Sequence, residues 1–219
     1  MTSLSIDQNV STRQPISQTQ NNSKDFEKTL QDTTESAKNT ESLAIKAATT
    51  ASNRELQANT LIQHKEEEIK EFNDAKKGIE IILPTKMGNS DSINKVVIAS
   101  YYHSEAVDNL AGQAKDVPSA ISNWANSNEA DKETTKTKLI KETDELVNAA
   151  QTSVKTAKTT ISEAKKLASE TYVGPFNIIT DFQKEIIKDA KLTLEKANDI
   201  LSHAEETQSK VNNMLHENK

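Results

Sequence analysis

The chain lacks several residue types that most folds use. Cysteine is absent from all 219 residues, which excludes disulfide bonds, thiolate nucleophiles and cysteine-ligated metals. Four glycines and four prolines leave few positions for turns, so the structural elements must be long. Apolar residues make up 34% of the chain and aromatic residues 4%, against roughly 45–50% apolar residues in globular domains. This composition favours long helices that each bury one narrow stripe over a thick core.

Two further absences concern membranes and nucleic acids. No stretch approaches the roughly 18 consecutive apolar residues of a membrane span, and no apolar block follows basic charge near the N-terminus. A cleavable secretory signal is therefore not expected. The net charge of -6 provides no basic face for phosphate groups, so we expect no nucleic-acid partner.

Residues 1–23 are polar and nearly uncharged. Serine, threonine, glutamine and asparagine dominate, Asp7 and Arg13 carry the only side-chain charges, and Pro15 lies inside the segment. Such a segment buries too little apolar surface to offset the entropy of ordering, so we predict a disordered leader. It is either an ordinary flexible tail or an uncleaved export signal. Its composition resembles the leaders of bacterial type III secretion substrates, and this resemblance implies export without a cleavable signal.

The pattern of residues 24–83 predicts one long helix. Ser23 is suited to cap its N-terminus, and Pro84 is expected to end it. The apolar positions that recur every seventh residue are Leu30, Ala37, Ala44, Ala51 and Ala58. Small residues in such a seam let a neighbouring helix approach closely, although each of them buries little area.

Residues 84–127 predict a small helical module. A loop is expected at its start, followed by a helix that begins at Asp91 or Ser92. Pro118 is well placed in the first turn of a second short helix, which carries Trp124, the only tryptophan.

The strongest pattern spans residues 128–219. Apolar and small residues alternate at spacings of three and four from Val147 to Thr171, and the spacing resumes from Ile179 to Met214. This alternation is typical of a helix with one narrow apolar seam. A Gly-Pro pair interrupts it within residues 172–176, which predicts a long helical hairpin with its tip there.

The expected fold class is therefore all-α. We predict an elongated, antiparallel, coiled-coil-like helical bundle, in which the long N-terminal helix packs along the C-terminal hairpin and the small module lies between them. The seam pattern leaves open whether the N-terminal helix pairs within the chain or with another copy.

No motif in the chain supports catalysis. The four histidines, His64, His103, His203 and His216, include no pair at metal-binding spacing, so we expect exposed side chains without a ligand. The runs of glutamate are expected on solvent faces, where nothing shifts their pKa values for acid–base work. Four glycines are too few for the usual phosphate-binding loops. We therefore expect no enzyme, no cofactor and no metal.

The hairpin tip is the first candidate binding site. Tyr172, Val173 and Phe176 place bulky groups where loops are usually polar. Apolar groups at a projecting end suit contact with a protein or a membrane. The alternative is that they fold back onto Trp124 or Ile121 and close the end of the bundle.

The aromatic residues of the module form the second candidate site. Tyr101, Tyr102 and Trp124 could contact a partner or pack in the core. Base stacking is a weak interpretation, because stacking platforms work inside positively charged grooves and these residues have no cluster of basic neighbours.

These observations favour a non-enzymatic interaction or structural protein that binds a host or envelope partner. Long helices with alanine seams resemble, in outline only, the helical translocator, tip and pore-forming toxin proteins of bacterial pathogens, which implies a secreted effector-like or virulence role. They also resemble phasins, which coat polyester granules with amphipathic helices. Three functions follow as hypotheses: a protein-binding module, a helical protein that opens on a membrane or granule surface, and a self-assembling rod or filament subunit.

Overall fold

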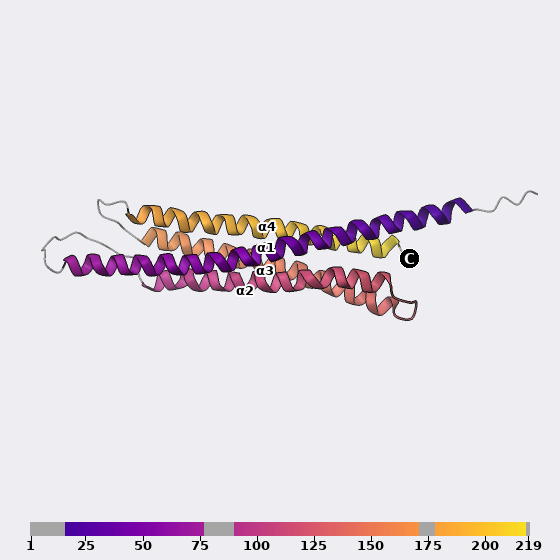
Figure 1. The fold of residues 1–219 in the computed structure, drawn as a ribbon, viewed down its shortest axis with the longest axis horizontal. Helices are drawn as coiled ribbons and strands as arrows, with labels where there is room; N and C mark the ends of the chain where they lie inside the picture. Colours follow the sequence, from indigo (N-terminus) through magenta and orange to yellow (C-terminus); the bar gives the residue numbers. More distant parts are fainter. Residues whose placement is uncertain (1–15, 77–89, 171–177, 218–219) are drawn as a thin grey trace, which may run out of the picture.

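The chain folds into four long helices. A computed structural model describes residues 16–76, 90–170 and 178–217. The helices are α1 Ile16–Lys76, α2 Ser90–Ala125, α3 Lys132–Glu170 and α4 Ile178–Glu217. Figure 1 shows them lying along one common axis, and no strand occurs in the described ranges. The predicted all-α, elongated helical bundle is confirmed.

Within the described ranges, the helices form a closed ring of neighbours. α1 and α3 each pack against both α2 and α4. Phe26 contacts Trp124, whereas Ala51 and His103 line one cavity, so α1 and α2 run in opposite directions. The hydroxyls of Ser36 and Thr207 lie 3.1 Å apart across α1 and α4. In the other three pairs of neighbours as well, contacts that lie later on one helix lie earlier on the next, so each helix is antiparallel to both of its neighbours.

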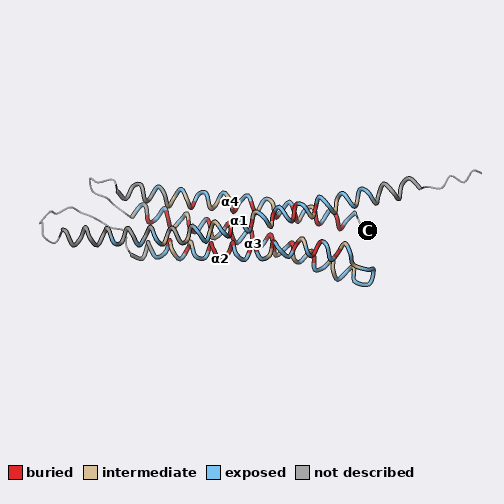
Figure 2. Tube along the Cα trace, viewed as in Figure 1, coloured by how far each residue is buried: buried red, intermediate tan, exposed pale blue. Residues whose placement is uncertain are grey.

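The seam predicted in the hairpin forms the core of α3 and α4. Buried residues line the inner side of each helix in Figure 2. The predicted seam positions that are buried are Val147, Ala150, Val154, Ala157, Ala164, Ala190, Ala197, Ile200, Ala204, Thr207, Val211 and Met214. The three–four spacing determines this result, because it keeps these side chains on one face of each helix. Additional buried positions such as Leu139 and Leu146 are needed because α3 packs on two neighbours.

The N-terminal helix begins earlier than predicted. α1 starts at Ile16, so Ser23 lies inside it and does not cap it, and residues 16–23 are helical instead of disordered. The composition argument failed because serine, asparagine and glutamine oppose a helix only weakly. Pro15 in the sequence is the overlooked signal, since proline favours the first turn of a helix.

The predicted break at Pro118 is wrong. α2 is one helix of 36 residues with Pro118 inside it, and it packs along α1 and α3 as a full member of the bundle. A proline inside a helix costs about 3 kcal/mol. Val117, Ile121 and Trp124 are buried around it. Each such side chain contributes about 1.5–3 kcal/mol, so their burial outweighs the cost of the proline.

Three predicted features lie outside the described residues. These are most of the leader, the helix end at Pro84 with the loop that follows, and the hairpin tip with Tyr172, Val173 and Phe176. The two arms of the hairpin are described on either side of the tip, as α3 and α4.

Candidate functional site

The outward face of α2 carries a cluster of exposed apolar side chains, named here the α2 patch. Ile98, Tyr101 and Tyr102 expose 52%, 46% and 56% of their surface. Residues three and four positions apart share one helix face, so these three side chains are neighbours. The opposite face of the same helix segment packs in the core through Val96 and Ala99. The α2 patch is therefore the side of α2 that no helix covers in the described structure.

The two tyrosines form an ordered pair with an acidic rim. Their rings meet edge to face, with centroids 5.8 Å apart. The Tyr101 hydroxyl donates a hydrogen bond of 2.5 Å to Glu105 Oε1. This bond, the charge of Glu105 and the more distant charge of Glu55 on α1 raise the pKa of Tyr101 above its ordinary value. The α2 patch thus combines apolar rings with negative charge.

Trp124 lies in the core at one end of the bundle, 2% exposed. Phe26 meets its ring edge to face at 6.0 Å. Lys132 Nζ lies 4.4 Å from the ring centroid and donates a hydrogen bond to the Trp124 carbonyl oxygen at 3.0 Å. About 35 Å of helix separates Trp124 from Tyr101, at roughly 1.5 Å per residue. The structure therefore does not unite the aromatic residues predicted for the module into one site.

His103 is buried, contrary to the expectation of exposed histidines. It is 5% exposed, and its Nδ1 lies 3.0 Å from Thr156 Oγ1 on α3. Two positions along a helix correspond to a turn of about 200°, so Tyr101 faces outward and His103 inward. The overlooked signal is the spacing of His103, which follows Val96 by seven positions and precedes Leu110 by seven, so it shares their buried face. His203 is half-exposed and His216 is exposed, as expected.

His103 lines a small cavity inside the bundle. The cavity measures about 20 Å³ and receives residues from all four helices, including Thr50, Ser153 and Thr193. Ser153 Oγ is buried and has no hydrogen-bond partner among the described residues. A space of this size holds about one water molecule. It is too small for a metabolite, and Tyr101 lies on the other side of the helix.

The described residues hold neither a metal-binding cluster nor a membrane-spanning helix. They contain no group of three or more histidines or carboxylates placed to hold a metal ion. No helix among them is long and apolar enough to cross a membrane.

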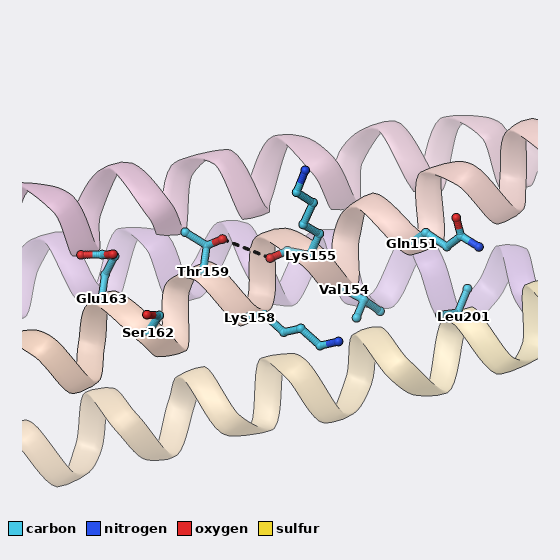
Figure 3. Close-up of a pocket in the computed structure, with 8 residues that line it drawn as sticks. All are labelled: Gln151, Val154, Lys155, Lys158, Thr159, Ser162, Glu163 and Leu201. Carbon is cyan, nitrogen blue, oxygen red and sulfur yellow. Dashed lines mark hydrogen bonds between the residues drawn. The ribbon is translucent and has the colours of Figure 1, made fainter.

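An open groove on the outer side of α3 was not foreseen from the sequence. Val154 and Leu201 supply its apolar lining, and Lys155 and Lys158 are among its polar residues. Figure 3 shows Leu201 extending from α4 toward α3 and Lys158 directed toward α4, while Lys155 extends toward the opposite side of α3. The net charge of the whole chain did not reveal this feature. The lysines are seen to share one face only when the exposed positions of α3 are known.

Comparison with known proteins gives no relative. No protein-family model, no curated protein and no solved structure matches the chain.

Proposed function

We propose that the chain is a non-enzymatic helical interaction protein that binds a protein partner through the α2 patch. The observation that carries this proposal is the exposure of Ile98, Tyr101 and Tyr102 on one face. Among the described residues, the large apolar side chains that remain exposed are Ile45, Ile98, Tyr101, Tyr102 and Leu192. Three of these five lie within five positions of α2, whereas Ile45 and Leu192 are single exposed residues.

The chemistry of the α2 patch suits a protein surface. Tyrosine contributes strongly to protein interfaces, because its ring buries a large area at a small cost in side-chain entropy. The carboxylate of Glu105 accepts the hydrogen bond of Tyr101 and is exposed. A partner that presents an arginine or lysine near an apolar group would satisfy both features.

The interior of the bundle supports a role without catalysis. The cavity at His103 measures about 20 Å³, and the carboxylates Glu205 and Glu206 lie exposed to solvent. Neither feature offers a water-excluding cleft for a substrate. Export by a route without a cleavable signal belongs to the same proposal, and its support is the polar composition of residues 1–23.

Site-specific photocrosslinking tests the α2 patch. A benzophenone amino acid replaces Tyr102, and a matched control carries it at the single exposed residue Ile45. After irradiation of cells that produce the protein, we expect a discrete adduct of one protein from position 102 and none from position 45. The adduct should disappear when Tyr101→Ser and Ile98→Ser are added, and the melting temperature should change little because both residues are exposed.

Two results would contradict the proposal. One is the same adducts from both positions, which would indicate random collision. The other is a large loss of thermal stability in the Tyr101→Ser and Ile98→Ser variant, which would assign these residues to packing within the chain.

A further inference from the structure

The outer face of α3 carries a row of lysines, named here the basic stripe. Lys155, Lys158, Lys165 and Lys166 are all exposed, and the other exposed residues from position 151 to 169 are uncharged. Glu163 is only partly exposed, and it pairs with Lys166 at 2.6 Å. The chain as a whole has a net charge of -6, so this face is a local reversal of charge.

α4 carries the acidic counterpart, named here the acidic stripe. It consists of Glu195, Asp199, Glu205 and Glu206, all exposed. The exposed positions of α3 from 155 to 169 recur on α4 from 195 to 209 with identical spacing, forty residues later. Lysine at 155, 165 and 166 is matched by glutamate at 195, 205 and 206. The two stripes therefore have the same periodicity and opposite charge.

The stripes do not neutralise each other within one chain. Gln208 donates a hydrogen bond of 2.7 Å to Asp144, which fixes the register of the antiparallel pair α3 and α4. In this register the acidic stripe lies beside residues near 146–157 of α3. Lys155 is level with its start, and Lys158, Lys165 and Lys166 lie beyond it, toward the hairpin tip. The ion pair of Glu206 is with Lys210 on its own helix, at 2.8 Å.

The remaining charges of the stripes are available. In the described part of the chain, Lys155, Lys158 and Lys165 take part in no ion pair, and neither do Glu195, Asp199 and Glu205. On the tip side, α4 adds the exposed Lys188 and Lys191 to the basic half. The α3–α4 side is therefore basic toward the tip. Toward the other end, α4 is acidic, and α3 adds the exposed Asp144 and Lys138 together with the ion pair of Lys141 and Glu145.

We propose that this side binds a second copy of the chain in antiparallel orientation. A two-fold axis across the bundle then places the basic half of each copy over the acidic half of the other, and the contact closes as a dimer. A parallel copy would place like charges together and be repelled. The groove with Val154 and Leu201 lies where the two halves meet, so both copies contribute apolar surface near the axis.

A second copy fits this surface better than an anionic membrane does. An anionic membrane would attract the basic half of this side and repel the acidic half, because both halves lie on the same side of the bundle. Another copy uses both halves at once. This inference does not depend on the α2 patch, which lies on a different helix.

Exposed ion pairs contribute little singly and are screened by salt, so the association must be reversible and salt-sensitive. Sedimentation velocity of the full-length protein over a wide concentration range measures it. At about 0.1 M ionic strength, with a Debye length of about 10 Å, we expect the mass to rise to two chains. At about 1 M, with a Debye length of about 3 Å, we expect single chains.

Charge reversal locates the contact. The basic-reversed variant carries Lys155→Glu, Lys158→Glu, Lys165→Glu and Lys166→Glu, and the acid-reversed variant carries Glu195→Lys, Asp199→Lys, Glu205→Lys and Glu206→Lys. Each should remain a single chain at about 0.1 M salt, and an equimolar mixture of the two should regain the two-chain mass. A matched control reverses four exposed lysines elsewhere, Lys28→Glu, Lys38→Glu, Lys46→Glu and Lys115→Glu, and should associate at least tenfold more tightly than the basic-reversed variant.

Several outcomes would overturn this proposal. The first is a wild-type protein that stays a single chain at about 0.1 M salt. The second is a mixture of the two reversed variants that does not associate. The third is a control variant that loses association as completely as the basic-reversed variant does. Wild-type protein that stays a single chain but cosediments with phosphatidylserine vesicles would assign the basic stripe to a membrane. We expect Tyr101→Ser to leave the dimer intact. An absent dimer would therefore contradict this inference without contradicting partner binding at the α2 patch.

Discussion

At the scale of the residue, neighbouring positions of one helix have opposite roles. Tyr101 lies on the surface beside Glu105, and His103, two positions later, lies in the core beside Thr156. The turn of about 100° per residue produces this division. The hydrogen bond from Tyr101 to Glu105 is lost when the phenol ionises, because the oxygen then has no proton to donate.

This bond predicts a measurable titration. The chain has three tyrosines, so the double variant Tyr102→Phe and Tyr172→Phe retains Tyr101 as its single phenol. The pKa of Tyr101 is raised from 10.0, so we expect it to ionise at higher pH than a free phenol. The hydrogen bond of Tyr101 contributes fully to the stability of the fold below the pKa of Tyr101 in the unfolded chain. This contribution is lost as the pH rises through the higher pKa of Tyr101 in the folded chain. Adding Glu105→Gln should lower the midpoint of tyrosinate absorbance, and an unchanged midpoint would show that Glu105 does not control it.

At the scale of the element, α2 continues through a residue that should end it. Pro118 has no backbone N–H to donate to the carbonyl one turn earlier. The helix persists because the neighbouring Val117 and Ile121 are fully buried between other helices. Tertiary burial therefore overrides a strong local preference.

Removing the proline should stabilise the protein. We expect Pro118→Ala to raise the free energy of unfolding by about 1–3 kcal/mol, measured by urea denaturation, because the helix regains a hydrogen bond. Gly112→Ala is the matched control. A Cβ atom at that position meets nothing within 4 Å, so only the helix propensity changes, by about 1 kcal/mol. A loss of stability in Pro118→Ala, with a gain in the control, would mean that packing requires the local geometry of the proline.

At the scale of the whole molecule, the four helices contribute unequally to the core. Among the side chains that the structure describes, the largest fully buried ones of α2, α3 and α4 include Leu110, Leu146 and Met214, whereas those of α1 are Thr33 and Thr40. The contact between α1 and α4 includes a hydroxyl network, in which Thr40 Oγ1 lies 3.0 Å from Thr207 Oγ1. Alanine and threonine bury little apolar area, so we expect residues 24–53 of α1 to be held most weakly.

Native-state hydrogen exchange should reveal this order. We expect the amides of α1 in residues 24–53 to exchange faster than those around Leu110 and Leu146, because opening α1 exposes less apolar surface than global unfolding does. Thr40→Val, which removes the hydroxyl and keeps the shape, should change the exchange of α1 and leave that of α3 unaltered. Equal protection in all four helices would show that the bundle opens as one unit.

The sequence alone determined the all-α class, the great length of the helices and the hairpin of α3 and α4. These features follow from local periodicity, which places residues such as Ala157 and Ala197 on one face whatever the partner is. The same reasoning located Tyr101 and Tyr102 as candidates, although it could not separate them from Trp124.

The tertiary structure alone decided which side of each helix is covered. It made α2 a full member of the bundle through Pro118, and it set the register in which the basic stripe extends past the acidic stripe toward the hairpin tip. Local spacing cannot supply these results, because they depend on how residues far apart in the chain meet. The geometry of a helix fixes how its own side chains are spaced around its axis. Only packing against neighbouring helices decides which of these side chains face water.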